Sequence, residues 1–288
     1  MSYEIIKDYR HNEQLRKCFN ELSQKTFGGL EFETWYHSGY WNEKYIPYSI
    51  LRDGKIISNV SVNRIDCTLN GTPKHYIQLG TVMTDENHRN KGYARILMEE
   101  VLKDFSDCDG FYLYANDSVL DFYPKFGFEK AEEYRFSARI DSKTNNTATP
   151  VPMTNQQEWH NFLKEKNQRK SQGFLTMDTD NLMMFYLTQF MQENVYYIKE
   201  KDAYVIAEAY GDTLTLYDIF SAENIDIMSL CSCFGKDIKK VEFAFTPRNY
   251  SELEKSLYKE EDTTFFVLGE TIKKDIKQFF AFPQLTHA

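Results

Sequence analysis

The sequence predicts an α/β protein of the α+β type, in which a mixed central β-sheet flanked by helices is followed by a second, smaller α/β unit. Three observations support this fold class. Apolar runs early in the chain are separated by short turn signals. A helical apolar stripe at residues 92–105 lies between two strand-like runs. A similar order of strands and helices recurs after residue 153.

The first elements are expected to form an antiparallel meander. An opening strand, YEIIKDY, precedes a helix whose apolar stripe is Leu15, Cys18, Phe19 and Leu22. The next runs, IPYSILR and IISNVSVNRIDCTL, are separated by Asp53-Gly54, and YIQLGTVMT follows Asn70-Gly71. Both dipeptides favour two-residue hairpin turns, so the three runs are expected to pair in sequence order.

The helix at residues 92–105 is expected to join this meander to a buried strand, GFYLYA. A strand, helix and strand in this order imply parallel pairing through a right-handed crossover. Gly127 then fits the C-terminal end of a short helix. The segment FEKAEEYRFSARI, residues 128–140, predicts one long returning strand.

Residues 141–152, DSKTNNTATPVP, are polar, contain two prolines and predict a linker. The chain is thereby divided into a unit at residues 1–140 and another at 153–288. The second unit is expected to contain helices near 182–191, 224–234 and 251–258, with strands VYYIK, AYVIAEA, TLTLYDIF, VEFAFT and TTFFVLG. This repeated order predicts an internal duplication with diverged sequence.

Charge and cysteine usage narrow the functional classes. The chain has 34 basic and 43 acidic residues, and its net charge of −9 opposes general attraction to nucleic acid or an anionic membrane. The start MSYEIIKDYR lacks a signal-peptide core and no apolar run reaches membrane-spanning length, so a cytoplasmic protein is expected. Five scattered cysteines favour reduced thiols, and the histidines lack metal-ligand spacing, so no metal is expected.

The turn before the 92–105 helix carries the clearest chemical signal. A helix start has unpartnered N–H groups and partial positive charge, which together attract phosphate. Gly92 and Ala94 leave the backbone accessible, while Arg89 and Lys91 add positive charge. The plainer alternative is that Gly92 only relaxes the turn and the basic residues are solvated. Neither GxxxxGK[ST] nor a full GxGxxG is present.

The wider context favours the phosphate interpretation. LGTVMTDENHRNKGYARILMEEVL, followed by YLYAND and SVLDFYPKFGF, resembles the GNAT superfamily of acyl-CoA N-acyltransferases. The family's [RQ]xxG[xG][AG] turn is matched by Arg89-Asn90-Lys91-Gly92-Tyr93-Ala94, and its Tyr before a Gly-Phe pair by Tyr123, Gly127 and Phe128. The resemblance covers roughly residues 1–140. The second unit would then be a degenerate GNAT-like repeat.

The resemblance implies roles for residues by position. The backbone of the turn Arg89–Ala94 would hold the pyrophosphate of acetyl-CoA. Val82 and Thr84, on the preceding strand, would lie beside the acyl group and pair with the pantetheine arm, which Asn116 would also contact. Tyr123 would be the general acid. Taken alone, each of these residues also suits a purely structural role, as a strand residue, a strand end or a packed tyrosine.

The implied function is transfer of an acetyl group from acetyl-CoA to a primary amine of a small molecule or peptide, with no metal. The alternative is a non-catalytic CoA-binding regulatory or interaction module. No general base is assigned, and the candidates are Glu31, Glu33, Asp66 and Asp85, with Gln78 as a residue that could position water.

The second unit departs from the motif. Between IFSAEN and IDIMSLCSCFG, where its phosphate turn would fall, there is no glycine and no basic residue. That unit is not expected to hold acetyl-CoA in the same way. It would complete the sheet, cover the substrate cleft or form a homodimer surface.

Overall fold

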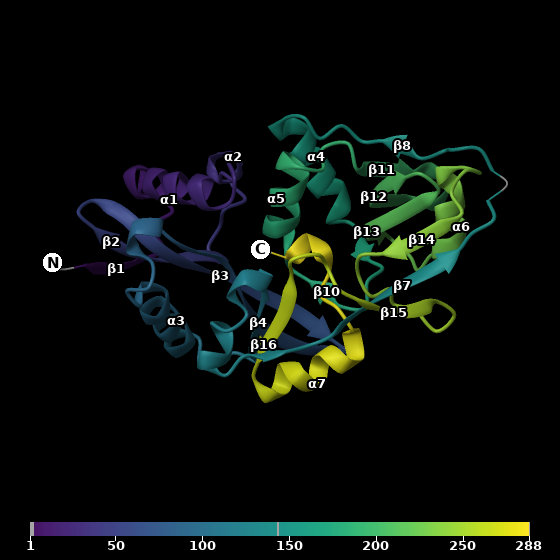
Figure 1. Ribbon diagram of the computed structural model, residues 1–288. Helices are drawn as coiled ribbons and strands as arrows, with labels where there is room; N and C mark the ends of the chain where they lie inside the picture. Colours follow the sequence, from purple (N-terminus) through teal and green to yellow (C-terminus); the bar gives the residue numbers. More distant parts are fainter. Residues whose placement is uncertain (1–2, 143, 288) are drawn as a thin grey trace.

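The computed structural model describes residues 3–142 and 144–287. The chain forms two mixed β-sheets with helices on their faces and between them, as the α/β prediction states (Figure 1). The first sheet contains, in spatial order, β1 (Glu4–Lys7), β2 (Tyr45–Arg52), β3 (Lys55–Leu69), β4 (Thr72–Thr84), β5 (Gly110–Ala115), β16 (Thr264–Leu268) and β6 (Glu129–Lys130), with β10 (Thr176–Met177) paired to β3.

The second sheet is built mainly from the later half of the chain. In spatial order it contains β15 (Glu254–Tyr258), β7 (Glu133–Arg139), β14 (Lys240–Phe243), β13 (Thr213–Ser221), β12 (Ala203–Tyr210), β11 (Val195–Ile198) and β8 (Thr149–Pro150), with β9 (Lys170–Ser171) paired to β13. β8 lies within the stretch expected to be a linker, where it pairs with β11.

The helices separate into those that cover a sheet and those that lie between the two. They are α1 (Glu13–Thr26), α2 (Glu33–His37), α3 (Tyr93–Asp104), α4 (Gln156–Lys166), α5 (Asp180–Gln189), α6 (Ile227–Cys231) and α7 (Glu270–Phe279). Short 3₁₀ helices are η1 (Glu86–His88), η2 (Asp117–Val119), η3 (Tyr123–Phe126), η4 (Lys199–Lys201), η5 (Ser232–Phe234) and η6 (Gln284–Thr286). In Figure 1, α1 and α2 lie above the first sheet and α3 lies below it.

The predicted meander forms as expected. β2, β3 and β4 pair antiparallel in sequence order. Asp53, Gly54, Asn70 and Gly71 all have positive φ angles, between 49° and 80°, which the tightest hairpin turns require. The predicted helix is α3, and its residues Leu97, Met98 and Val101 are buried in the apolar cluster beneath the sheet. The strand after it, β5, pairs parallel with β4 as predicted.

The sheets exchange strands across the predicted division at residues 141–152. β7, from the first part of the chain, pairs with β14 and β15 in the second sheet. β16, from the last part, pairs with β5 and β6 in the first sheet. In Figure 1, yellow β16 accordingly lies beside the blue strands. The single long strand predicted at residues 128–140 is therefore wrong, because β6 and β7 belong to different sheets.

Two further local predictions are corrected. The helix predicted at 251–258 is wrong, since β15 occupies part of that segment and pairs with the edge of β7. Tertiary pairing here overrides the local helical spacing. Helix α7, which the sequence interpretation missed, follows β16 and buries Ile272, Ile276 and Phe279. Their spacing of four and then three residues is a helical signal.

The last residues of the chain tie the two sheets together. The Phe282 ring stacks on Tyr112 of β5 with centroids 3.9 Å apart, and the His287 ring stacks on Tyr114 at 3.8 Å. Gln284 accepts a hydrogen bond from Arg135 of β7 at 2.7 Å. This C-terminal segment therefore contacts one strand of each sheet.

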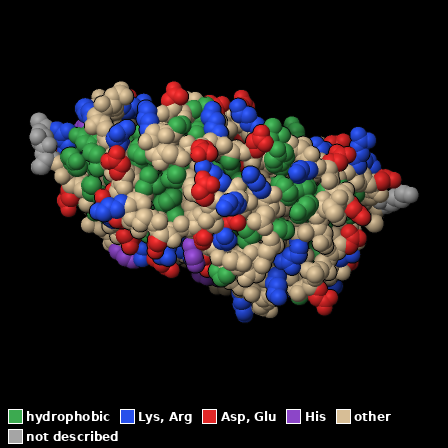
Figure 2. All heavy atoms as spheres, turned by 90° about the horizontal axis from the view of Figure 1, so that it is seen from below, with side chains coloured by type: hydrophobic (Ala, Val, Ile, Leu, Met, Phe, Trp, Pro, Cys, Tyr) green, Lys and Arg blue, Asp and Glu red, His purple; other side chains and the backbone are tan. Residues whose placement is uncertain are grey.

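The molecular surface carries mixed charge on the face drawn in Figure 2, where Lys and Arg side chains are interspersed with Asp and Glu. Such a face lacks the broad positive potential that attracts the phosphates of nucleic acids. Among the described residues, no helix has the length and apolar character needed to cross a membrane.

We expect Phe282→Ala to lower the free energy of unfolding by about 3–5 kcal/mol, because it leaves a cavity against Tyr112. Urea denaturation measures the change. Tyr210→Ala, at a side chain that is 87 % exposed, is the control and should change stability by less than about 0.5 kcal/mol. Equal effects of the two substitutions would contradict a structural role for the C-terminal segment.

Glu133, at the start of β7, gives a pH-dependent prediction. Burial raises the pKa of its carboxyl to about 7, although Tyr114 donates a hydrogen bond to it at 2.9 Å. Because the folded-state pKa exceeds the unfolded value, the folded protein loses stability as pH rises from about 4.5 to 7. We expect Glu133→Gln to remove this loss and to be more stable than wild type at pH 8 by up to about 3 kcal/mol.

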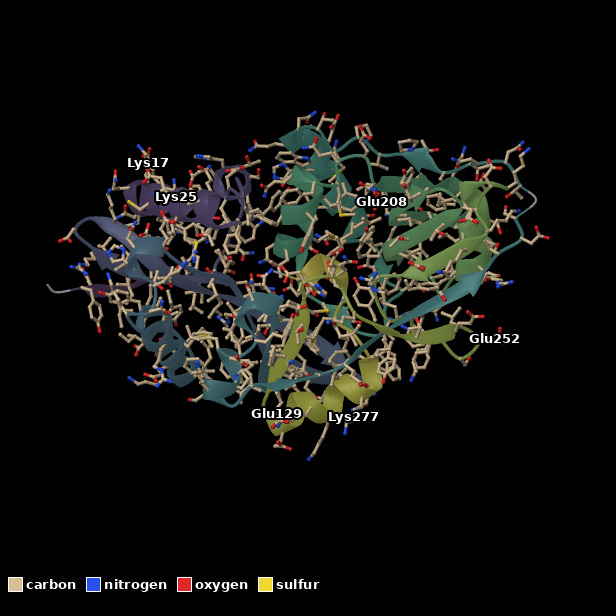
Figure 3. The ribbon with its side chains drawn as sticks, in the orientation of Figure 1. Lys17, Lys25, Glu129, Glu208, Glu252 and Lys277 are labelled. Atoms are coloured by element: carbon tan, nitrogen blue, oxygen red, sulfur yellow. The ribbon has the colours of Figure 1, made fainter. Side chains whose placement is uncertain are left out.

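Urea denaturation at pH 5 and pH 8 tests the Glu133 prediction. Glu252→Gln, at an exposed residue that points outward in Figure 3, should show the wild-type pH dependence. The prediction fails if Glu133→Gln and Glu252→Gln lose equal stability between the two pH values.

Candidate active site

The central feature of the site is an opening between two parallel strands. β4 and β5 pair only from Tyr76 opposite Gly110 to Leu79 opposite Leu113. β4 then continues to Thr84 and β5 to Ala115 without further pairing between them. Backbone groups on this side of β4 are consequently left without a strand partner.

A β-bulge in β4 accompanies the separation. The register with β3 shifts between Asn59, opposite Met83, and Ser61, opposite Gly80. Thr81, inside the bulge, has a φ angle of +48°, which is uncommon for a β-branched residue. Its hydroxyl lies 2.9 Å from the Tyr45 hydroxyl, and its carbonyl accepts a hydrogen bond from Asn59. Bulges bend a strand, so this bulge accounts for the departure of β4 from β5.

The hydrogen bonds of β4 show which backbone groups face the opening. The amide of Asp85 donates to the Ile57 carbonyl of β3 at 2.9 Å, and the Met83 carbonyl accepts a hydrogen bond from Ser58. Because successive residues of a strand direct their backbone groups to opposite edges, those of Val82 and Thr84 face away from β3. The structure thus places both predicted residues along the opening.

The turn that follows β4 has an exposed, left-handed backbone. Gly92 is the N-cap of α3 with φ +81° and ψ 5°, and Asn90 has φ +62°. Within the described chain, the amides of residues 90–94 donate no hydrogen bond to another protein atom. A Cβ at Gly92 would meet nothing within 4 Å, so open space surrounds this position. These amides and the N-terminal end of the α3 dipole form an anion-binding geometry.

The two basic side chains of the turn are exposed and fold back on the backbone. Arg89 donates to the Thr84 carbonyl at 3.3 Å, and Lys91 donates to the Asn87 carbonyl at 2.7 Å. Neither has a carboxylate partner in the part of the chain that the structure describes. Their positive charge remains available to an anion at the turn.

Tyr123 lies at the start of η3 and is only 4 % exposed. Its ring belongs to the apolar cluster beneath the first sheet, which also contacts Val82 of β4 and Tyr93 of the turn. Burial raises the pKa of the Tyr123 phenol to about 12, so the hydroxyl is protonated at neutral pH. The short helix ends at Gly127, with φ +88°, as the sequence predicted.

Asn116 lies at the end of β5, the other strand that borders the opening. It follows β5, is exposed, and its side-chain amide donates to Asp262 at 3.1 Å. Asp262 also accepts from the backbone amide of Asp117 at 3.0 Å. The sequence interpretation missed Asp262, and a contact between residues so far apart in the chain has no local sequence signal.

The acidic candidates for a general base have other partners. Glu31 accepts from the backbone amide of Glu33, and Glu33 accepts from Arg16 and Asn20. Asp66 pairs with His75 at 2.7 Å. Asp85 accepts from the Asn87 amide and contacts His88, whose hydrogen bond lowers the pKa of the Asp85 carboxyl. These contacts account for all four carboxylates structurally.

Gln78 and Asn63 form an unusual buried pair. They face each other across β4 and β3, and both are fully buried. Neither side-chain amide has a hydrogen-bond partner among the described residues. Because an unpaired buried polar group is costly, such a pair is suited to hold a small polar molecule such as water. The pair lies on the face of the sheet opposite α3, three residues before the bulge on β4.

The second sheet repeats the topology but not the turn. β13 and β14 pair parallel over four residues, from Thr213 opposite Lys240 to Leu216 opposite Phe243, with α6 between them in sequence. The order β13, α6 and β14 matches β4, α3 and β5. At the start of α6, however, the Asp226 carboxylate accepts from the amides of Met228 and Ser229. A negative side chain therefore occupies the position that is open in α3.

Part of the sequence and the overall fold resemble those of known proteins. Residues 11–128 match the model of the acetyltransferase (GNAT) family. A probable N-acyltransferase from Enterococcus faecalis is 14 % identical, with a TM-score of 0.62 over 93 % of this chain and 72 % of that one. A GCN5-related N-acetyltransferase from Kribbella flavida is 14 % identical, with a TM-score of 0.57 over 92 % and 70 % of the two chains. No curated protein matches the chain.

A third solved structure, a GCN5-related N-acetyltransferase from Anabaena variabilis, is 17 % identical with a TM-score of 0.56 over 92 % of this chain and 72 % of that one. At such identities the likeness concerns the fold. Residues 11–128 thus match the GNAT acetyltransferase family model, and the overall two-sheet fold resembles that of the solved N-acyltransferase structures.

We expect Gly92→Ala to lower the free energy of unfolding by about 1–2 kcal/mol, because the left-handed φ angle is sterically unfavourable for alanine. Gly92→Asn should lose less, since asparagine tolerates this conformation better. A Cβ at this position would meet no atom within 4 Å, so the two variants report on the backbone conformation and not on a steric clash. Equal stability of Gly92→Ala and wild type by urea denaturation would show that the turn does not hold this conformation.

Proposed function

We propose that the protein is an N-acetyltransferase that transfers an acetyl group from acetyl-CoA to a primary amine of a small molecule or peptide. The observation that carries this proposal is the set of open amides at residues 90–94, placed beside the unpaired edge of β4. A diphosphate fits the first feature and an extended amide-containing arm fits the second. The match of residues 11–128 to the GNAT family model supports the same reaction class.

Residues of the first unit would hold the co-substrate. The backbone of Asn90–Ala94 would bind the pyrophosphate, with positive charge added by Arg89 and Lys91. The outward backbone groups of Val82 and Thr84 would pair with the pantetheine amides. Asn116 would contact that arm through its side-chain oxygen, since its NH₂ group already donates to Asp262.

Acetyl-CoA supplies the acetyl group as a thioester. Backbone N–H groups along the opening, at Val82 and Thr84, are rigid donors that would stabilise negative charge developing on the carbonyl oxygen. The acceptor nitrogen forms a C–N bond as the C–S bond breaks, and the amine loses one proton. Tyr123 would donate its phenolic proton to the departing sulfur, because a phenol with a pKa near 12 is protonated at neutral pH.

The acceptor would approach from the face of the sheet that carries Gln78 and Asn63. Their unpartnered amides are suited to hold water near the reacting amine. The four carboxylates considered from the sequence have structural partners, so water is the more fitting first proton acceptor at this site. The five cysteines are free thiols in the described structure, which suits the reducing cytoplasm proposed for the enzyme.

The direct test is an amine-panel assay that measures thiol release from acetyl-CoA. Acetyl-CoA binding is measured in parallel by calorimetry, with Asp226→Ala as a control that opens the second helix start. Saturable acetyl-CoA binding together with amine-dependent thiol release is the expected result. Binding without turnover for every amine class would instead favour the non-catalytic CoA-binding module. Absence of both would overturn the proposal.

We expect Tyr123→Phe to lower kcat by about 100- to 10,000-fold while acetyl-CoA affinity changes little, because only the transferable proton is removed. Steady-state kinetics and calorimetry measure these two quantities. Tyr210→Phe, at an exposed position, is the matched control and should behave as wild type. An unchanged kcat for Tyr123→Phe would remove Tyr123 from the proposed chemistry.

A further inference from the structure

A cavity between the two sheets lies outside the proposed acetyl-transfer site. Its volume is about 460 Å³, within the range of small-molecule pockets. Segments from both parts of the chain line it, including α4, β9, β10, β13, the start of α5 and the C-terminal segment. None of the residues that line it belongs to the turn or to the opening between β4 and β5.

One wall of the cavity lies at the end of β4 that is opposite to the turn. Its lining residue Thr68 pairs with Pro73 near the start of β4, and Thr84 lies at the other end of that strand. Thr84 is eleven positions after Pro73, and a strand rises by about 3.3 Å per residue, so roughly 35 Å of strand separates these two residues.

One wall of the cavity carries the carboxylates of Asp180 and Asp218 and the ammonium group of Lys166. Lys166 pairs with Asp180, and its ammonium also lies 5.0 Å from the centre of the Phe220 ring. Asp218 uses one oxygen to accept from the Ser171 hydroxyl at 2.8 Å and from the Ile219 amide. Its second oxygen has no hydrogen-bond partner in the described chain. Arg169, which also lines the cavity, pairs with Glu165 and Asp202. Asp218 is thus the carboxylate of this wall that has no ion-pair partner among the described residues, and its charge favours a cationic group nearby.

The other side of the cavity carries unpaired positive charge. Arg248 is exposed, and its guanidinium donates only to the Ser171 carbonyl, at 3.4 Å. Lys170, the residue before Ser171, is also exposed and has no side-chain partner among described residues. Asp218 and Arg248 thus contact the hydroxyl and the carbonyl of the same residue. A carboxylate and a guanidinium therefore lie on either side of Ser171, and each has polar atoms without a hydrogen-bond partner among the described residues.

The remaining wall is apolar. Phe220, Phe245 and Met183 line it and are each at least nine-tenths buried. Phe174 and Leu285 extend the same surface. A ligand that uses both charged regions would therefore place an apolar side chain or ring against these residues.

We propose that this cavity binds a small zwitterion with an apolar side chain, of the amino acid class. Its ammonium group binds the free oxygen of Asp218, and its carboxylate binds Arg248 and Lys170. Its side chain packs against Phe220, Phe245 and Met183. The site is a binding site without chemistry of its own, and it does not depend on the acetyl-transfer proposal.

Isothermal calorimetry with L-phenylalanine as the probe tests this proposal on the full chain. We expect saturable binding at one site, with weaker binding of phenethylamine and 3-phenylpropionate, each of which lacks one charged group. Asp218→Asn and Arg248→Gln should each weaken L-phenylalanine binding by about tenfold or more, because each loses a charge-assisted hydrogen bond. Acetyl-CoA affinity should be unchanged in both variants.

Matched controls are Glu252→Gln and Lys17→Gln, at exposed residues that do not line the cavity and that are labelled in Figure 3. Both should bind L-phenylalanine as wild type does. No binding of any of the three probes at millimolar concentration would overturn the proposal, as would unchanged binding in the variants. Because Arg248 is exposed, Arg248→Gln provides the decisive comparison if Asp218→Asn does not fold.

Discussion

The separation of β4 from β5 is the constraint on which the rest of the site depends. If the two parallel strands paired over their full length, their backbone N–H and C=O groups would bond to each other, and none would be left for a ligand. Here the bulge at Thr81 turns β4 away after four paired residues. The backbone of Val82 and Thr84 faces the gap, and the same change of direction delivers the chain to the exposed turn before α3. One local distortion therefore creates both halves of the proposed acetyl-CoA site.

The two sheets differ in how the helix between their parallel strands begins. Both contain a parallel strand pair connected through a helix, and in both the pairing covers four residues. In the first, Gly92 leaves the helix start open. In the second, Asp226 caps the corresponding amides with its own carboxylate. A negative side chain at that point would compete with a bound phosphate, so the phosphate site proposed for α3 is not expected at the start of α6.

The sequence was sufficient for features that depend on neighbouring residues. Asp53-Gly54 and Asn70-Gly71 placed both hairpins, and the apolar stripe of α3 with Gly92 before it placed the turn. Features that depend on distant pairing were not accessible in this way. The exchange of β7 and β16 between sheets, and the contact of Asp262 with Asn116, join segments more than a hundred residues apart. Local helical spacing at residues 251–258 was overridden by pairing of β15 with β7, whereas α7 had a readable signal that was overlooked.

The most direct measurement is amide hydrogen exchange with and without acetyl-CoA. If the open helix start binds the pyrophosphate, exchange should slow at residues 90–94 and at Val82 and Thr84, while the amides of Met228 and Ser229 at the start of α6 should be unaffected. Slowed exchange confined to another part of the chain, with residues 90–94 unchanged, would contradict the proposed site.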